Sequence, residues 1–420
     1  MMTTVPSVLR SPSPATVFIA VGGLYIAQSV IGGVAMLGLP AVLRAQGLPL
    51  DQIGLLYLTV IPWALKFLWS PYVERFRLPA QGHNRSRLIV FAGGLLCAAG
   101  LAAIGLTGPY PLAPVLCVLL LVALVTSTVD IACDGYAVET LAKEHHGWGN
   151  TAQVGGSYLG SAIGAGLFLV LVDSIGWSYA AFAMAFLVII LGLPFVFGPA
   201  TRGTIETRPH APSLLLALKR PQVQKGLMIA AIYVAGQKWG LSMLGPFLID
   251  RGLDLATIGA LNGIGSMVVG FSGALLGGLL VRLWGATAVL ILAILLQAAL
   301  LAGLALFCFD DSLPRVFIMP IAIASSSGVM SVGFVALYSQ FMGWSDPKQA
   351  GVDFTLFQCV DGLISMAGGL GAGWIAEHLG YAVFFTVAAI IAVLAVPAIG
   401  LLMRGANGNA VAIVRPADGL

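Results

Sequence analysis

The chain has 420 residues, of which 59% are hydrophobic and 9% are charged, whereas an ordinary soluble domain is about a quarter charged. This composition excludes a water-soluble globular protein and leaves room for about twelve membrane-spanning helices of ~20 residues each. The net charge of +3 is too small to indicate a nucleic-acid partner. The five cysteines lie in apolar stretches without the spacing of metal ligands, so we expect neither a metal site nor a cofactor.

Apolar stretches bounded by charged residues, Pro or Gly predict twelve spans in two groups of six. The first group is placed at residues 17–43, 52–70, 88–107, 113–138, 152–172 and 178–197. The second group is placed at residues 226–249, 255–281, 286–308, 314–341, 351–376 and 381–403. The first apolar run is longer than a signal-peptide core, so we interpret it as a retained helix.

This pattern predicts an all-α membrane protein built from two six-helix bundles. We expect the bundles at residues 17–197 and 226–404, joined by a polar linker at 198–225. Tails are expected at residues 1–16 and 405–420.

The basic residues lie mainly on one side of the predicted membrane. With the N-terminus inside, fifteen Lys and Arg residues fall in cytoplasmic segments, and only Arg44, Arg251 and Arg315 face outside. Because positively charged loops remain in the cytoplasm, we predict that the linker and both termini are cytoplasmic. The expected location is the bacterial inner membrane.

The two halves resemble each other in sequence. Tyr25 in the first half corresponds to Tyr233 in the second, at an offset of 208 residues. The Gly-Ala-Gly triplets at 164–166 and 371–373 are 207 residues apart. A duplicated six-helix unit of this kind is similar to the major facilitator architecture, in which substrate binds between parallel repeats near the middle of the membrane.

Two ionisable residues of the second half are predicted at mid-membrane. Lys238 lies about 12 residues into its span, roughly 18 Å deep, and Asp361 lies at a similar depth in the eleventh span. An ionisable group inside a span costs at least ~2.5 kcal/mol unless it is paired or hydrated. We therefore predict a Lys238–Asp361 pair in the substrate cavity, with a purely structural ion pair as the alternative.

The fourth span carries Asp130 and Asp134, which share one helix face because they are four residues apart. Like charges at this spacing disfavour double ionisation, a property that suits a proton carrier. We predict that Asp130, Asp134 and Asp361 take part in proton coupling. The alternative is a structural network in which Arg75 or Lys66 neutralises the carboxylates.

A charged segment ends the second span and begins the loop that follows it. Lys66 is near enough to the cytoplasmic interface to act as a simple anchor. Glu74 and Arg75 are expected to contact the fourth span through Asp134 or Glu139 when the inner side is closed. Lys66, Glu74, Arg75 and Glu139 are therefore the predicted cytoplasmic gate.

Polar and aromatic side chains at matching depth are predicted to line the cavity, because a solute pocket needs a few hydrogen-bonding groups among apolar ones. Gln28 and Gln237 carry the most weight, since an amide that faces lipid is poorly satisfied. For any one aromatic residue, packing against lipid is the alternative. The predicted lining residues are Tyr25, Gln28, Tyr136, Tyr158, Tyr233, Gln237, Lys238, Trp239, Phe357, Gln358 and Asp361.

Two segments carry a family resemblance. They are Lys66-Phe-Leu-Trp-Ser-Pro with Glu74-Arg75 after it, and Asp130-Ile-Ala-Cys-Asp134-Gly-Tyr-Ala-Val-Glu139. They resemble the muropeptide permease and acetyl-coenzyme A transporter branch of the major facilitators. Within that branch, the chain length and the second segment are similar to bacterial siderophore permeases of the rhizobactin and pyochelin type. Glu74 departs from the family pattern, in which Asp is commoner.

The resemblance implies a transporter that imports an iron-loaded siderophore from periplasm to cytoplasm, driven by protons. The near alternative is a muropeptide permease, whose sugar-peptide substrate is expected to need more hydrogen-bonding groups than these apolar helices offer. A membrane-embedded enzyme or sensor is the remote alternative, but the sequence shows no paired metal motif and no nucleophile with a base. We expect a monomeric transporter whose partners are a small molecule, protons and the lipid bilayer.

Overall fold

The structure is a computed structural model that describes residues 13–48, 52, 55–81, 83–198, 211–253, 261–310 and 312–412. Parts of five predicted segments lie outside the described residues: 1–12 and 413–420 of the tails, 53–54 of the second span, 199–210 of the linker and 255–260 of the eighth span. The described residues form helices and connecting turns and contain no strand.

Six crossings make up the first half. Its elements, in chain order, are α1 (Pro14–Gly33), η1 (Val34–Gly38), α2 (Leu39–Ala45), η2 (Leu55–Val60), α4 (Ile61–Leu65), η3 (Lys66–Leu68), α5 (Ser70–Arg77), α6 (Ser86–Thr107), α7 (Leu112–Thr140), η4 (Lys143–His145), α8 (His146–Ala162), η5 (Ile163–Leu167), α9 (Phe168–Ile175) and α10 (Trp177–Phe197).

The second half repeats this arrangement after a short helix in the linker, α11 (Leu214–Lys219). Its elements are α12 (Pro221–Lys238), η6 (Trp239–Leu241), α13 (Leu244–Asp250), η7 (Leu261–Gly265), α15 (Ser266–Trp284), α16 (Ala286–Phe309), η8 (Arg315–Phe317), α17 (Ile318–Ile323), η9 (Ala324–Val329), α18 (Met330–Trp344), η10 (Pro347–Gln349) and α19 (Ala350–Ala412).

Ten helical segments of the described chain are long and apolar enough to cross a membrane. Three of the predicted spans have a different form. The second span is a series of short helices, because Pro62 and Pro71 each stand in the first turn of a new helix. The last two spans form the single element α19, which bends at Gly380, where φ is 80°. With these forms counted, the described residues account for twelve crossings and confirm the all-helical membrane fold.

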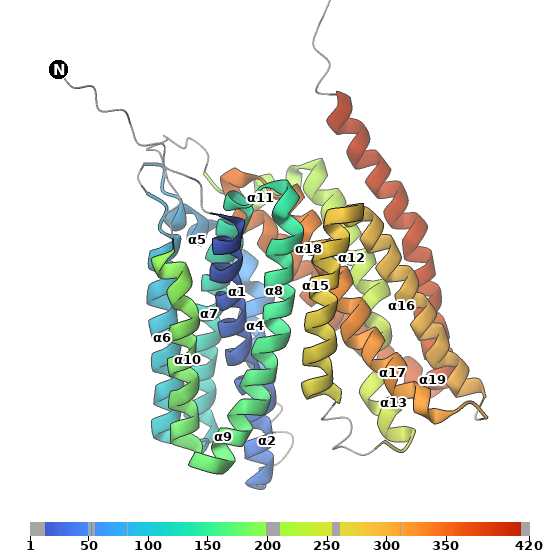
Figure 1. Ribbon diagram of the computed structural model, residues 1–420, viewed down its shortest axis with the longest axis horizontal. Coiled ribbons are helices and arrows are strands. Elements are labelled where there is room, and N and C mark those ends of the chain that lie inside the picture. The colour runs from blue at the N-terminus through green and yellow to red at the C-terminus, as the bar shows by residue number, and fades with distance from the viewer. Residues whose placement is uncertain are drawn as a thin grey trace, which may run out of the picture.

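The helices form two bundles that lie side by side (Figure 1). In the first bundle α1 packs on α8 and α10, and α6 packs on α7 and α10. In the second, α19 packs on α12 and α16, and α15 packs on α18. The first described turn of α1 and the last turn of α19 lie at the same end of the molecule, as an even number of crossings requires. That end is the predicted cytoplasmic side.

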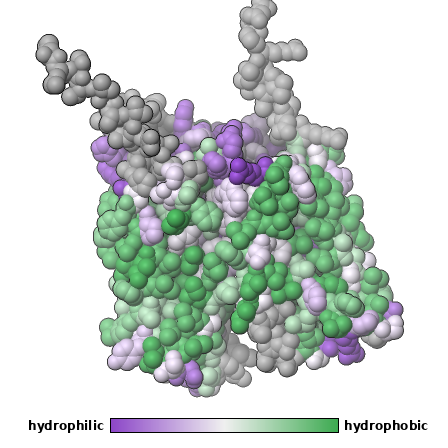
Figure 2. Space-filling view, viewed as in Figure 1, coloured by the Kyte–Doolittle hydropathy of each residue, from purple (hydrophilic) through white to green (hydrophobic). Residues whose placement is uncertain are grey.

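The outer surface carries the apolar belt that a bilayer requires (Figure 2). Large apolar side chains such as Leu96, Phe186 and Leu394 are more than half exposed, which would be costly in water. In lipid the same surface is solvated by acyl chains. The polar surface in Figure 2 gathers mainly at the predicted cytoplasmic end.

Close backbone contact holds α1 against the crossing formed by α8 and η5. A Cβ atom on Gly164 would overlap the carbonyl oxygen of Val30 and come within 2.9 Å of its carbonyl carbon. Gly33 approaches the same place, since its own Cβ would lie 3.0 Å from Gly164 Cα. Small residues permit this approach, and van der Waals packing then stabilises the helix pair within the membrane. The Gly-Ala-Gly triplet of the sequence thus has a packing role in the first half.

We predict that Gly164→Ala destabilises the protein, because the new methyl group meets the α1 backbone, which cannot rotate away. Overpacking of this kind costs about 1–3 kcal/mol. Gly166→Ala is the matched control, since nothing lies within 4 Å of its Cβ position and Ala is the better helix former. Thermal unfolding of the purified variants in detergent measures the difference. Equal melting temperatures for the two variants would contradict the assigned contact.

Candidate functional site

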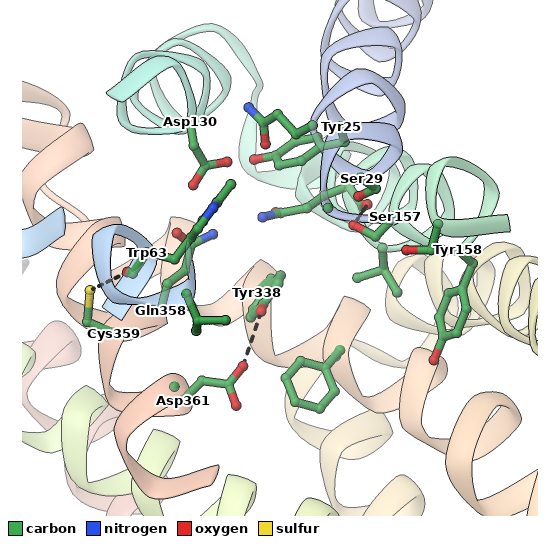
Figure 3. Close-up of a pocket in the computed structure, with 18 of the residues that line it drawn as sticks. Tyr25, Ser29, Trp63, Asp130, Ser157, Tyr158, Tyr338, Gln358, Cys359 and Asp361 are labelled. Atoms are coloured by element: carbon green, nitrogen blue, oxygen red, sulfur yellow. Dashed lines mark hydrogen bonds between the residues drawn. The ribbon is translucent and has the colours of Figure 1, made fainter. Parts of the chain in front are cut away.

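A cavity of about 790 Å³ lies between the two bundles, within the size range of about 300–1,000 Å³ found for small-molecule sites. Both halves contribute side chains to it, and Figure 3 shows many of them. The lining residues that carry polar groups are Tyr25, Gln28, Ser29, Tyr57, Trp63, Lys66, Asp130, Gln153, Ser157, Tyr158, Ser161, Lys238, Ser331, Tyr338, Gln358 and Asp361.

The cavity reaches away from the predicted cytoplasmic side. On α1 it extends to Gly32, about 18 residues after Pro14 and roughly 27 Å along the helix. Tyr57, which also lines it, belongs to η2 at the far end of the second span. The lining residues nearest the cytoplasmic ends of α1 and α8 are Tyr25 and Gln153. The cavity therefore occupies the middle and the outer part of the molecule.

The predicted pair of Lys238 and Asp361 is present in the cavity wall of the second half. Lys238 ends α12, and its Nζ donates to both carboxylate oxygens of Asp361 on α19, at 2.7 and 2.9 Å. The ammonium also lies 4.4 Å from the ring centroid of Phe334. Tyr338 on α18 donates to Asp361 at 3.5 Å. A bidentate pair with an aromatic neighbour offsets much of the cost of holding two charges within a membrane.

A second ion pair lies in the wall of the first half. Lys66 of η3 donates to Asp130 of α7 and to the amide oxygen of Gln358 on α19, so it connects the two bundles. Its side chain is only 3% exposed. Asp134 lies one turn nearer the cytoplasm and accepts a hydrogen bond from the hydroxyl of Tyr25. Its Oδ2 atom is buried and has no hydrogen-bond partner among the described residues.

Neutral polar groups cover the wall formed by α1 and α8. Gln28, Ser29, Gln153 and Ser157 all line the cavity, and Figure 3 shows Ser29 and Ser157 facing it beside Tyr25. Two buried amide atoms of this wall, Gln28 Nε2 and Gln153 Oε1, have no hydrogen-bond partner within the described part of the chain. A buried amide without a partner is unfavourable, so these two atoms would gain a partner if a change of side-chain conformation brought them to the cavity.

Charged side chains close the molecule between the cavity and its predicted cytoplasmic end. Arg77 donates to both oxygens of Glu74, at 2.6 and 2.9 Å, and to Glu139 on α7 at 3.0 Å. Arg77 and Glu74 are fully buried. The Glu74 carboxylate then accepts a hydrogen bond at 3.3 Å from the backbone N–H of Gly351, at the start of α19 in the other half. A carboxylate is stabilised at a helix N-terminus by the free N–H groups there.

Neutral contacts extend this closure between α8 and the second bundle. Thr151 donates to the carbonyl of Ala274 on α15 at 3.0 Å. Asn150 donates to Ser339 on α18 at 3.4 Å. The described residues are therefore closed on the predicted cytoplasmic side, and with that orientation the arrangement is that of an outward-facing transporter.

Further contacts tie the linker to the same region. Arg220 pairs with Asp353 on α19 and, at 3.3 Å, with Asp346. Arg75 donates to the backbone carbonyl of Pro212 at 3.2 Å. The part of the linker that the structure describes thus contacts both bundles.

Five residues that the sequence placed in the cavity are packed inside the helix bundles instead. Tyr136 stacks edge-on against Phe195, and Phe357 stacks on Phe341 with centroids 4.9 Å apart. Gln237 contacts Gln297 at 3.5 Å, and Trp239 donates to the carbonyl of Gly368 at 2.8 Å. Tyr233 is fully buried against Phe334. Each lies on the face of its helix that is turned toward its own bundle.

Two residues of the predicted cytoplasmic gate lie elsewhere in the structure. Lys66 is not an anchor at the interface, because its ammonium lies in the cavity wall with Asp130. Arg75 is exposed and contacts Pro212, whereas the buried partner of Glu74 and Glu139 is Arg77. The two arginines are two residues apart on a helix and therefore point in different directions.

Several lining residues were not predicted from the sequence. Tyr338, Trp63 and Gln153 line the cavity, and Gly351 forms part of the closure. Both Tyr338 and Gln153 are polar residues within predicted spans, but each lies near an end of its span at 314–341 or 152–172, so depth gave no signal for them. No sequence signal marked Gly351, because glycines are common throughout this chain.

The chain matches the family described as "Major Facilitator Superfamily" over residues 17–343. It is a member of that superfamily, and so a multi-pass membrane transporter and not an enzyme. The anhydromuropeptide permease of Escherichia coli K12 is 27% identical over 375 residues, which cover 87% of this chain and 74% of that protein. A transporter of Rickettsia conorii named AmpG 4 is 23% identical over 381 residues, 86% of this chain and 89% of that protein.

Solved structures share the fold at lower identity. The human organic anion transporter MFSD10 (TETRAN) superposes with a TM-score of 0.70 at 17% identity, covering 93% of this chain and 98% of that one. The transporter FucP in the outward conformation superposes with a TM-score of 0.67 at 16% identity, covering 92% and 97%. Both support the twelve-helix architecture derived above.

We predict that Gly351→Ala weakens the cytoplasmic closure. The added Cβ would lie 2.5 Å from Glu74 Oε2 and 3.0 Å from the carbonyl oxygen of Ile131. An overpacking cost of about 1–3 kcal/mol would shift the ratio of closed to open states roughly 5- to 150-fold. Gly343→Ala is the matched control, because its Cβ position has open space around it.

Double electron–electron resonance measures the shift as a change in the distance between spin labels at Arg75→Cys and Lys348→Cys. Both positions are exposed and lie on opposite halves. The Gly351→Ala protein should gain a population with a longer distance between the labels, and the Gly343→Ala protein should not. An unchanged distance distribution in Gly351→Ala would show that this contact does not hold the closure.

Proposed function

We propose that this protein imports a sugar-peptide of the anhydromuropeptide class across the bacterial inner membrane by alternating access. The observation that carries the proposal is the similarity to the anhydromuropeptide permease of Escherichia coli along 87% of the chain. The predicted orientation, with both termini in the cytoplasm, makes the outer cavity an entrance from the periplasm. Movement of the two bundles about the cavity then carries the substrate inward.

The chemistry of the cavity supports a sugar-peptide. The sequence predicted few hydrogen-bonding groups for such a substrate, but polar side chains from nine helical elements line the one cavity among its apolar residues. Sugar hydroxyls and peptide amides both donate and accept hydrogen bonds, and the amides of Gln28 and Gln153 have atoms without partners in the described residues. Trp63 and Tyr57 provide aromatic faces on which a sugar ring packs.

A ferric siderophore is the competing substrate, and it rests on the resemblance of the segment from Asp130 to Glu139. The relatives named above support the muropeptide alternative more than the siderophore prediction. The two substrates are therefore compared directly in the experiment below.

Proton coupling is proposed for Asp130, Asp134 and Asp361. Asp130 and Asp361 each neutralise a lysine in the cavity wall, so a proton on either carboxyl releases an ammonium group. Asp134 contacts Tyr25 through one oxygen, while its buried Oδ2 has no partner among the described residues and provides a place for a proton. A transporter that moves protons with its substrate needs such protonatable groups next to the cavity.

We predict that proteoliposomes containing the protein accumulate radiolabelled anhydromuramyl tripeptide when an inward proton gradient is imposed. An uncoupler should abolish the accumulation, because the proton gradient provides the driving force. Unlabelled ferric pyochelin, added in excess, should not compete. Accumulation of ferric pyochelin without accumulation of the tripeptide would overturn the proposed substrate class.

We also predict that the double variant Asp130→Asn, Asp134→Asn exchanges labelled for unlabelled tripeptide but loses gradient-driven accumulation by at least about tenfold. Exchange needs the cavity and the bundle movement, whereas accumulation also needs a protonatable group. Asp173→Asn is the control, because Asp173 is exposed on α9. Full accumulation by the double variant would remove both residues from the coupling mechanism.

A further inference from the structure

Lys238 is the cation of the cavity that is available to a solute. Lys66 and Lys238 are the two basic residues among the described lining residues. The Lys66 side chain is 3% exposed, while that of Lys238 is 29% exposed. An anionic group that enters the cavity therefore meets Lys238 first.

The donor groups of the two lysines reinforce this difference. Lys66 donates to Asp130 and to Gln358, and Trp63 covers it at 5.3 Å from the ring centroid. Lys238 directs its donors at one partner, Asp361, with Phe334 on the other side. Replacing Asp361 as its partner is therefore enough to free the Lys238 ammonium, whereas the Lys66 ammonium is held by hydrogen bonds to groups of both bundles.

The polar groups of the cavity are separated by chemical kind. In Figure 3, Asp361 lies at the bottom of the view with Tyr338 above it, and Tyr25, Ser29 and Ser157 lie across the cavity from Asp361, on the same side as Asp130. That side also holds the Lys66–Asp130 pair, which is internally neutral, while α1 and α8 present hydroxyls and amides. A solute that carries an acidic group at one end and hydroxyl or amide groups at the other matches this arrangement.

Charge balance limits how such a solute can bind. The lining contains two ammonium groups and two carboxylates, Asp130 and Asp361, so its formal charge is zero. A carboxylate that enters alone would leave one uncompensated negative charge in a region of low dielectric, which is costly. One proton taken up together with the carboxylate restores neutrality.

We propose that a carboxylate of the substrate replaces Asp361 as the partner of Lys238, and that Asp361 takes up one proton as it is released. This inference rests on the proposed function and names the part of the substrate that the site recognises. No covalent bond changes: the proton passes from periplasmic water to a carboxylate oxygen of Asp361, and the Lys238 ammonium remains charged. The neutral Asp361 keeps Tyr338 and Ser365 as hydrogen-bond partners.

The groups that face Asp361 come from several elements. Lys238 lies on α12 and Tyr338 on α18, while Ser365 is one turn away on α19 itself. Across the cavity, the Lys66–Asp130 pair is connected to the same helix through Gln358. Because that pair is internally neutral, Lys238 is the main charge that acts on Asp361.

The test compares the binding of anhydromuramyl tripeptide with that of the same compound carrying amides in place of its carboxylates. Purified full-length protein in lipid nanodiscs is titrated by calorimetry. Wild-type protein should prefer the acid by about tenfold, and Asp361→Asn should prefer it by about 100-fold, because the competing carboxylate is gone. The double variant Lys238→Ala, Asp361→Asn leaves no unpaired charge and should bind both compounds equally.

The double variant Lys66→Ala, Asp130→Asn is the matched control, since it removes the other ion pair of the cavity without leaving an unpaired charge. It should keep a preference for the acid, whatever its overall affinity. Loss of the preference in Lys66→Ala, Asp130→Asn, or its survival in Lys238→Ala, Asp361→Asn, would overturn the assignment to Lys238.

Proton uptake tests the exchange of partners separately. Calorimetry in buffers of different ionisation enthalpy should show about one proton taken up when wild-type protein binds the acid, and none for the amide or for Asp361→Asn. Binding of the acid without proton uptake would refute the exchange. Equal binding of acid and amide by wild-type protein would refute the inference alone, whereas binding of neither compound would refute the proposed function.

Discussion

Charge neutrality within the membrane is the constraint on which this structure depends. The two lysines that lie in the cavity each face a carboxylate, and one of these pairs belongs to each bundle. Because an isolated charge in a low-dielectric region is costly, neither pair can open unless another ion or a proton takes the place of the lost partner. The requirement that makes the pairs stable therefore also makes them suitable for coupling a solute to protons.

Three segments connect the ion pairs of the cavity to the closure at the predicted cytoplasmic side. The second span holds Lys66 in the cavity and ends at Arg77 in the closure. On α7, Asp130 and Glu139 are about 9 residues apart, roughly 14 Å along the helix. On α19, Gly351 contacts Glu74, and Gln358 contacts Lys66 about two turns later. Any movement that separates the bundles at one level must therefore affect the other.

The close packing of α1 on α8 serves the same purpose. Backbone contact at Gly164 makes the first bundle a stiff body, since packed interiors resist gradual deformation. The contacts that join the bundles at the closure combine hydrogen bonds, such as Asn150 to Ser339 and Gly351 to Glu74, with close packing of α8 on α15. A stiff bundle can rock as a unit about such an interface, as the alternating-access proposal requires.

Hydropathy and charge predicted the fold well because they respond to the bilayer directly. The twelve spans and the Lys238–Asp361 pair follow from the cost of placing polar groups in lipid. The direction in which a side chain points could not be predicted in the same way. A membrane helix is apolar toward both lipid and core, so its hydrophobic pattern does not distinguish the two faces. Tyr233 and Gln237 were placed in the cavity for this reason, and Arg75 was preferred to Arg77.

The most direct measurement is an experimental structure of the protein in nanodiscs with anhydromuramyl tripeptide bound. The account predicts the ligand between the bundles, with one of its carboxylates within hydrogen-bond distance of Lys238 Nζ and with Asp361 turned away from it. Its sugar should contact the wall that contains Gln28 and Gln153. A bound ligand with the Lys238–Asp361 contacts still at 2.7 and 2.9 Å, and with no carboxylate at Lys238, would contradict the account.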